Sequence, residues 1–361
     1  MYNIIHKATC LVKHYDSQGE KIMKKIWKCG IIGLSMGVFH LDAVLNNGAE
    51  IGAICDVNEE TLKKVGDKYG IPEEKRFTDW KALVALEGLD IIQIVTPDQL
   101  HREMSEAALA AGKHVLCEKP IALKREDIAA IVKAAEASDK KFMVGQVMRL
   151  NPAKAKIAEM ARGGEIGELY CVESEYAHDY ATILHGWRAD PLRHGVLGGG
   201  CHAVDLLRYI AGDPLEVFAY GSHKMLPEVS YDDATVAVLK YPNGIIGRIF
   251  VSTGCKRPYT SRTVIYGTKG TIIWDDTAPT DIILHHVDKD GVYLEKPSKV
   301  IKIDPSHHNI TKELEILIDH IENDTPVAMS AREGAKTAAI CMAIIESTKT
   351  GLPVVPDYEF C

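Results

Sequence analysis

The chain has 361 residues, a formal net charge of −8 at pH 7 and a charged fraction of 25%. This length allows two domains with separate cores, and the hydrophobic fraction of 46% is ordinary for a globular protein, so we expect no long disordered span. The negative charge and the lack of a Lys/Arg cluster argue against nucleic acid as a partner, and no apolar run approaches the roughly 20 residues of a membrane-spanning helix.

The N-terminal segment and the cysteines indicate the cellular compartment of the protein. The first 22 residues mix charges with few apolar residues and lack the apolar core of a signal peptide. Nine cysteines are scattered along the chain without a C-x-x-C pair, which indicates reduced thiols rather than a disulfide framework or a zinc site. We therefore predict an N-terminal arm over residues 1–24 without an assigned function, a cytoplasmic protein and no metal.

The first part of the chain alternates short apolar runs with helical patterns. We predict strands at 26–33, 50–55, 90–95, 114–117 and 141–145, and helices at 39–45, 59–69, 103–111 and 127–137. Nearly continuous apolar strands separated by helices are typical of a parallel sheet covered on both faces. Residues 25–145 therefore predict an α/β domain with a doubly wound parallel sheet.

Four of these predicted strands end in turn-forming or polar residues. Gly33, Asp56, Thr96-Pro97 and Glu118-Lys119-Pro120 follow them in chain order. Ligands of such sheets bind at the carboxyl ends of the strands, so we expect these residues to meet at one site.

The first strand end resembles a phosphate-binding loop. Residues 30–37, G-I-I-G-L-S-M-G, place glycines between a strand and a helix, where the backbone can approach a pyrophosphate. The loop is irregular, because Ser35 replaces the middle glycine of G-x-G-x-x-G and the spacing to Gly37 is one residue short. Asp56, 23 residues after Gly33, strengthens the prediction, since a carboxylate there accepts bonds from ribose hydroxyls and repels a 2′-phosphate. We predict NAD rather than NADP.

The second part has longer β-segments. We predict strands at 167–176, 215–223, 234–241, 245–252, 263–266 and 271–274, followed by helices at 309–321 and 331–348. The turns P-N-G at 242–244 and G-T-K-G at 267–270 suit hairpins. Residues 146–361 therefore predict an α+β domain with a large, open, mostly antiparallel sheet, separated from the first domain by a cleft.

Two segments of this second domain carry candidate chemistry. In G-V-L-G-G-G-C-H-A-V-D, residues 195–205, three glycines bring the backbone close to a neighbour and start a helix with His202 and Asp205 on one face. A buried His202 beside a locally paired Asp205 is the structural alternative. In E-S-E-Y-A-H-D-Y, residues 173–180, rings and polar groups suit a polyol pocket, and a solvated loop fits equally well.

Four motifs in order resemble one protein family. They are V-T-P-D-Q-L-H at 95–101, A-G-K-H-V-L-C-E-K-P at 111–120, C-H-A-V-D at 201–205 and Y-G-T-K-G-T at 266–271. Between residues 25 and 356 the chain resembles the glucose–fructose oxidoreductase, inositol dehydrogenase and rhizopine-catabolism (Gfo/Idh/MocA) family. The resemblance implies an NAD-binding Rossmann domain at 25–145 and a C-terminal sheet that forms a homo-oligomer, which would be a dimer, tetramer or hexamer.

The resemblance also implies roles for single residues. Lys119 would be the catalytic lysine and His202 its partner in proton handling. The predicted cofactor-binding residues are Gly33, Ser35, Met36, Gly37, Asp56, Thr96, Pro97, His101, Glu118, Lys119, Trp187 and Arg188. The predicted substrate-binding residues are Lys119, Arg149, Tyr176, His178, Asp179, Cys201, His202 and Asp205. Many dehydrogenases of the family have an Asp four residues before the catalytic His, and this chain has Gly198 there, which widens the pocket.

These features predict an NAD-dependent oxidoreductase that oxidises a ring secondary hydroxyl of a sugar, glycoside or cyclitol. One alternative is transient oxidation at sugar C3, elimination of the aglycone and re-reduction, with no net change of the cofactor. A second alternative, outside enzymes, is a cofactor-binding regulator or scaffold. The expected partners are a small-molecule substrate and further copies of the chain, with neither nucleic acid nor a membrane.

Overall fold

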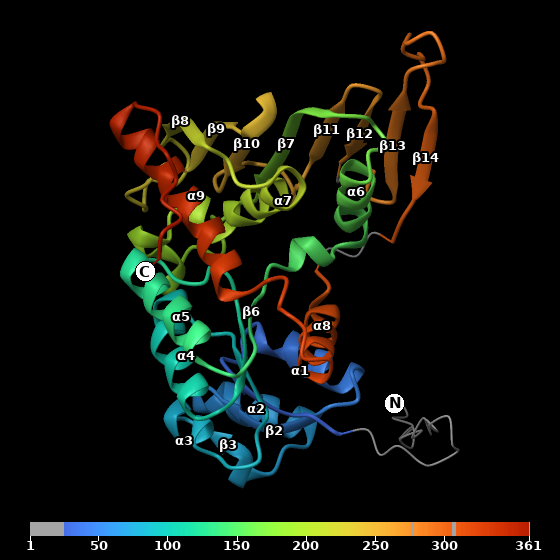
Figure 1. Cartoon of the computed structure of the whole chain (residues 1–361). Helices are drawn as coiled ribbons and strands as arrows, with labels where there is room; N and C mark the ends of the chain where they lie inside the picture. Colours follow the sequence, from blue (N-terminus) through green and yellow to red (C-terminus); the bar gives the residue numbers. More distant parts are fainter. Residues whose placement is uncertain (1–24, 276–277, 305–307, 361) are drawn as a thin grey trace, which may run out of the picture.

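The computed structural model describes residues 25–275, 278–304 and 308–360, so the predicted arm at 1–24 lies outside the described residues. Two sheets lie one above the other in Figure 1, each with its own helices. No helix in the described ranges is both long and apolar enough to cross a membrane.

The N-terminal sheet is parallel throughout and has the strand order β3-β2-β1-β4-β5-β6. Its strands are β1 (Lys28–Ile32), β2 (Glu50–Cys55), β3 (Arg76–Phe77), β4 (Ile91–Ile94), β5 (His114–Cys117) and β6 (Phe142–Val144). The order reverses between β1 and β4, which is the point where such sheets bind ligands. The predicted doubly wound parallel sheet is confirmed.

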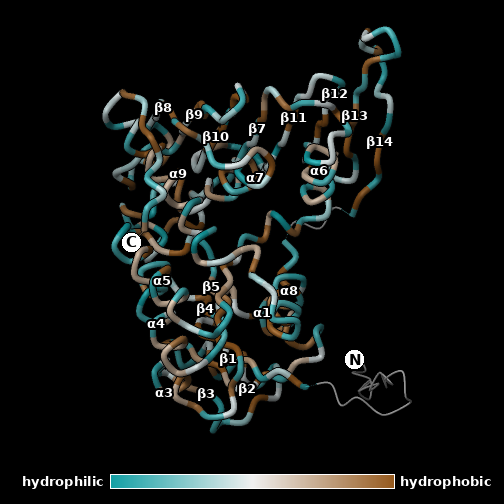
Figure 2. The backbone as a smooth tube through the Cα atoms, in the orientation of Figure 1, coloured by the Kyte–Doolittle hydropathy of each residue, from teal (hydrophilic) through white to brown (hydrophobic). Residues whose placement is uncertain are grey.

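Helices cover both faces of this sheet because successive strand residues point to opposite sides. The helices are α1 (Gly37–Asn46), α2 (Glu59–Tyr69), α3 (Trp80–Val84), α4 (His101–Ala110) and α5 (Arg125–Ala137). Ile31 and Ile54 pack with α1 and α2 in one core, whereas Ile32 and Cys55 pack with α3, α4 and α5 in the other. Figure 2 shows the corresponding hydrophobic segments in the strands between the helices.

The C-terminal sheet has the order β14-β13-β12-β11-β7-β10-β9-β8. Its strands are β7 (Leu169–Ala177), β8 (Glu216–Ser222), β9 (Ala234–Lys240), β10 (Ile246–Ser252), β11 (Thr263–Gly267), β12 (Gly270–Trp274), β13 (Asp281–His286) and β14 (Lys299–Lys302). All neighbours pair antiparallel except β7 with β10, so the predicted mostly antiparallel open sheet is confirmed. Helices α6 (Pro152–Arg162), α7 (Cys201–Ala211) and α9 (Ala331–Thr350) lie between this sheet and the first domain (Figure 1).

Helix α8 (Ile310–Glu322) follows the second sheet in sequence but packs on the first domain beside α1 (Figure 1). Leu314, Leu317 and Ile318 of α8 share a core with strands β1, β2 and β4. The predicted range 146–361 for the second domain therefore includes a helix that belongs in space to the first. The sequence pattern gives the helix but not its position, because its partners on α1 are more than 250 residues away.

Candidate active site

A cavity of about 740 Å³ lies between the two domains, within the range of about 300–1,000 Å³ that is usual for ligand pockets. Its walls come from the ends of strands β4, β5 and β7, from the start of α1, from α7 and from the segment that enters α8. The predicted convergence of strand ends therefore holds for β4 and β5, whose following residues Thr96, Glu118 and Lys119 all line this cavity.

Lys119 and His202 come together at this cavity although they belong to different domains. Lys119 follows β5, and His202 lies in the first turn of α7. Both side chains line the cavity, and Lys119 Nζ donates to the carbonyl oxygen of Gly198 at 3.5 Å. An amine and an imidazole at one cavity can exchange a proton with a substrate hydroxyl.

The three glycines before α7 are required by close packing. Residues Val196–Gly200 form a π-helical turn that runs directly into the helix. A Cβ at Gly199 would lie 2.4 Å from the hydroxyl of Tyr180, and one at Gly200 would lie 2.5 Å from Val251. The expected close approach of this backbone is confirmed, and it brings the helix start against the aromatic wall of the cavity.

Gly198 makes room for Arg193. A Cβ at Gly198 would lie 2.5 Å from Nη1 of Arg193, so the guanidinium occupies the space beside this position. Arg193 Nε donates to Asp98 Oδ2 at 2.7 Å, and its Nη2 donates to the same Gly198 carbonyl that Lys119 contacts. Beside Gly198, this chain therefore has a cation that is paired with Asp98 from the segment after β4.

Aromatic rings form the wall beside His202. The ring of Tyr176, at the end of β7, lies 6.0 Å from the His202 ring, and its hydroxyl is 2.8 Å from that of Tyr180 and 3.3 Å from His178 Nδ1. Burial, together with the charges of Lys119 and Arg193, lowers the pKa of His202 well below its usual value. His202 is therefore neutral at physiological pH, with one ring nitrogen unprotonated.

Glu118 is held by a buried histidine on α1. His40 Nε2 is 3.2 Å from Glu118 Oε1, and its Nδ1 is 2.8 Å from the side-chain oxygen of Gln93. Burial alone would raise the pKa of Glu118, but His40 and the charge of Lys119 outweigh burial and lower it to about 2. The carboxylate at this end of the cavity is thus ionised and fixed in orientation.

The glycine loop approaches the cavity at the start of α1. Gly33 has φ +89°, and a Cβ there would lie 2.5 Å from the carbonyl oxygen of Val95, so only glycine fits. No side chain caps the N-terminus of α1 and its first turn has no acidic residue, which leaves backbone N–H groups for an anion. Met36 and Phe39 line the cavity here. This end fits the pyrophosphate of a dinucleotide.

Asp56 and His101 connect backbone segments around the site through hydrogen bonds. Asp56 Oδ2 accepts a hydrogen bond from Leu34 N at 2.8 Å, which ties the end of β2 to the glycine loop. The ring nitrogens of His101 lie 3.1 Å from the carbonyl oxygen of Thr96 and 3.0 Å from that of Pro120. His101 is fully buried, so it joins the segments after β4 and β5 and does not line the cavity.

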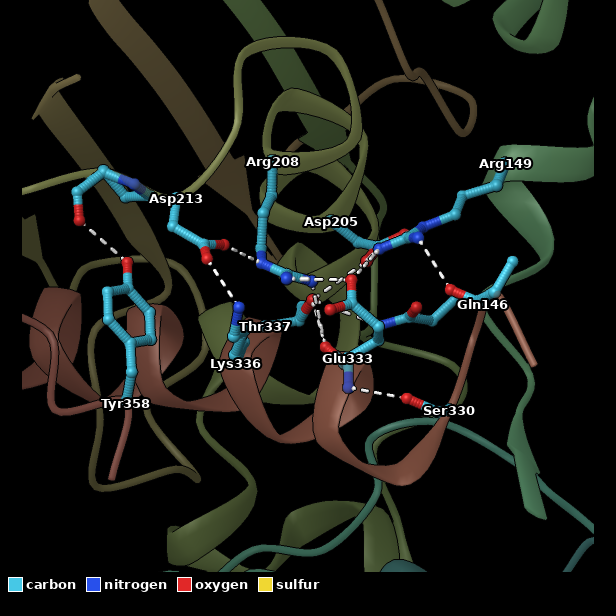
Figure 3. Close-up of polar contacts among 12 residues, drawn as sticks. Gln146, Arg149, Asp205, Arg208, Asp213, Ser330, Glu333, Lys336, Thr337 and Tyr358 are labelled. Carbon is cyan, nitrogen blue, oxygen red and sulfur yellow. Dashed lines mark hydrogen bonds and ion pairs between the residues drawn. The ribbon is translucent and has the colours of Figure 1, made fainter. Parts of the chain in front are cut away.

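Four predicted substrate residues do not line the large cavity. Arg149 and Asp205 form a buried ion pair with each other, shown in Figure 3, and neither lines the large cavity. Asp179 pairs with the exposed Lys256, and Cys201 is buried. The structure brings Lys119, Tyr176, His178 and His202 to the large cavity, and Cys201 and Asp205 line a second, small pocket together with Lys119 and His202.

Several residues at the site were not predicted. Asp98 and Arg193 pair across 95 residues, and His40 reaches Glu118 across 78. Asp98 lies within the motif V-T-P-D-Q-L-H, which could have drawn attention to it. For Arg193 and His40 the only sequence signal is a polar residue near a glycine run, which does not identify a partner.

Comparisons with known proteins agree with this architecture. The family model described as "Oxidoreductase family, NAD-binding Rossmann fold" matches residues 27–146, and "GFO/IDH/MocA C-terminal domain" matches 155–273. Myo-inositol 2-dehydrogenase of Thermotoga maritima is 27% identical over 321 residues, 85% of this chain and 92% of that protein. D-apiose dehydrogenase of Rhizobium rhizogenes is 28% identical over 319 residues, 85% of this chain and 90% of that protein.

A solved structure of levoglucosan dehydrogenase in complex with NADH superposes with a TM-score of 0.83 at 22% identity, over 92% of this chain and 100% of that one. At this identity the likeness establishes the fold of both domains.

Proposed function

Because the chain belongs to the Gfo/Idh/MocA oxidoreductase family, we propose that it oxidises a ring secondary hydroxyl of a sugar, glycoside or cyclitol with NAD. The relatives include inositol and apiose dehydrogenases. The observation that carries the proposal is the meeting of Lys119 and His202 at one cavity with an aromatic wall and a glycine loop.

The proposed reaction removes a hydride from the carbinol carbon and a proton from its hydroxyl. Bound NAD supplies the hydride acceptor. Lys119 holds the hydroxyl oxygen and stabilises its developing negative charge, and the neutral His202 accepts the proton. The close packing of Gly199 against Tyr176 and Tyr180 fixes the start of α7, and therefore the position of His202.

The predicted cofactor residues other than His101 would form the proposed NAD site. The loop residues Gly33, Ser35, Met36 and Gly37 would hold the pyrophosphate at the start of α1. Asp56 would select NAD over NADP by repelling a 2′-phosphate. Thr96, Pro97 and Glu118 would line the nicotinamide end. Trp187 and Arg188, which stack on each other with 4.4 Å from the guanidinium carbon to the ring centre, line the cavity on its second-domain side.

Replacing Lys119 by alanine tests the assignment. We expect kcat to fall by about 10²–10⁴-fold, the usual contribution of a general acid–base group, while NAD still binds. Lys133→Ala, on the exposed side of α5, is the matched control and should keep full activity. Wild-type turnover by Lys119→Ala on a panel of sugars, inositols and glycosides would refute the proposal. Release of free aglycone without accumulation of NADH would indicate transient oxidation and elimination instead.

The outer face of the second sheet supports a proposed homo-oligomer. On β8, β9 and β10 the residues that point away from α7 and α9 include the exposed Tyr220, Val236, Val238 and Ile246. Opposite-facing residues on the same strands are buried under the helices. A contiguous exposed apolar surface on a regular sheet is typical of a protein–protein interface.

A further inference from the structure

We propose that Arg193 makes the substrate site selective for a sugar acid, a substrate that carries a carboxylate close to the hydroxyl to be oxidised. The inference rests on the proposed function and names the substrate class of the same site. It arises from Arg193, which lies beside Gly198 and is not one of the predicted cofactor residues.

The geometry places Arg193 next to the catalytic amine. Lys119 Nζ and Arg193 Nη2 lie 3.5 and 3.2 Å from one carbonyl oxygen, that of Gly198. Arg193 lines the cavity although only 6% of the residue is exposed, so its position is fixed by packing. Its Nε donates a hydrogen bond to Asp98 Oδ2 and its Nη2 donates one to the Gly198 carbonyl oxygen. Its Nη1 lies on the side of the Gly198 Cα hydrogen.

The cations at this end of the cavity outnumber the free acids. Asp98 is 2% exposed and bound to Arg193, and Glu118 is paired with His40. Within the described residues, neither Lys119 nor the cavity-lining Arg188 forms an ion pair with an acid. The positive charges at this end of the cavity affect one another. Burial is the main cause that lowers the pKa of Arg188, and the charge of Arg193 lowers it further.

A carboxylate on the substrate would compensate the excess positive charge at this end of the cavity. Its oxygens can accept hydrogen bonds from a lysine amine and from an arginine N–H, and charge-assisted bonds of this kind are about twice as strong as neutral ones. A neutral hydroxymethyl group at the same place leaves the partly dehydrated amine of Lys119 without a charged partner, which disfavours binding. Oxidation would convert the carbinol to a carbonyl and leave the carboxylate unchanged, so the acid group acts only in recognition.

The test compares sugars that differ only in oxidation state at one carbon. Binding to the NADH-loaded enzyme is measured by titration calorimetry for D-glucuronate against D-glucose, D-galacturonate against D-galactose and D-gluconate against D-glucitol. We expect the acid to bind at least tenfold more tightly than its neutral counterpart in at least one pair. NAD reduction by the same compounds is followed separately, because it tests the proposed function and not the preference.

Variants assign the preference to Arg193. Arg193→Met should abolish the acid preference, Arg193→Lys should keep part of it, and Arg102→Met, at an exposed ion pair on α4, should change nothing. If Arg193→Met does not fold because Asp98 is left unpaired, the double variant Arg193→Met with Asp98→Asn removes both charges together.

Equal binding of acids and neutral sugars would overturn the proposal, as would no binding of either class. An acid preference that survives in Arg193→Met would also overturn it. Glucose 6-phosphate is included as a second anion, and tighter binding of this phosphate than of all three acids would rule out the carboxylate assignment.

Discussion

Replacing Asp205 by alanine separates a substrate role from a structural one. Asp205 is 2% exposed and accepts hydrogen bonds from Arg149 Nε at 2.8 Å, Arg149 Nη2 at 2.7 Å and Thr337 Oγ1 at 2.9 Å. Figure 3 shows this network joining α7 and α9 to the segment after β6. Alanine would leave the buried guanidinium of Arg149 without its carboxylate.

The expected loss follows from the burial of the pair. Removing one partner of a buried ion pair costs about 3–5 kcal/mol. Glu333 Oε2 lies 3.7 Å from Arg149 Nη2 and stays in place, so we expect the lower end, about 3 kcal/mol. Stabilities of whole domains are only about 5–15 kcal/mol, so this loss should move the unfolding midpoint clearly.

Urea unfolding of the wild type, Asp205→Ala and Asp205→Asn measures this loss. Asparagine keeps the shape and one acceptor, so it should lose less than alanine. Asp139→Ala, which removes an exposed acid, is the control and should leave the midpoint almost unchanged. The reasoning is refuted if Asp205→Ala keeps wild-type stability while the KM for sugar rises, because Asp205 would then act on the substrate as the sequence predicted.

Three further outcomes are expected. Gly33→Ala should weaken NAD binding at least tenfold in a fluorescence titration, because its Cβ would meet the Val95 carbonyl at φ +89°; unchanged affinity would contradict the loop assignment. Glu313 of α8 is fully buried, its carboxyl oxygens have no hydrogen-bond partner among the described residues, and burial raises its pKa well above its usual value. The stability that this protonated acid contributes is lost as pH rises above its unfolded pKa, so Glu313→Gln should gain stability over the wild type between pH 5 and pH 8 in thermal unfolding, and a constant difference would refute the sign. Val238→Glu on the outer sheet face should convert the proposed oligomer to monomers in light scattering, whereas an unchanged mass would exclude this face as the interface.

The local elements of the fold could be predicted from the sequence. The ranges 50–55 and 114–117 were predicted as strands and 59–69 as a helix, and the structure confirms all three to the residue. Helix α2 has an Asn58 cap and ends at Gly70 with φ +65°, so residues next to the helix determine both of its boundaries. The elements that were missed include β3, with two residues, and α3, with five, which are too short to show a period.

The sequence by itself determined that Lys119 follows a buried strand and that His202 starts a helix after three glycines, because both facts depend on residues close by in the chain. Only the tertiary structure decided which side chains these residues meet. It placed Arg193 in the space beside Gly198, paired Asp205 with Arg149, and packed α8 on the first domain. Pairings of this kind join residues from 5 to more than 250 positions apart, and they are set by the packing of whole elements and by the pairing of buried charges, which no local pattern records.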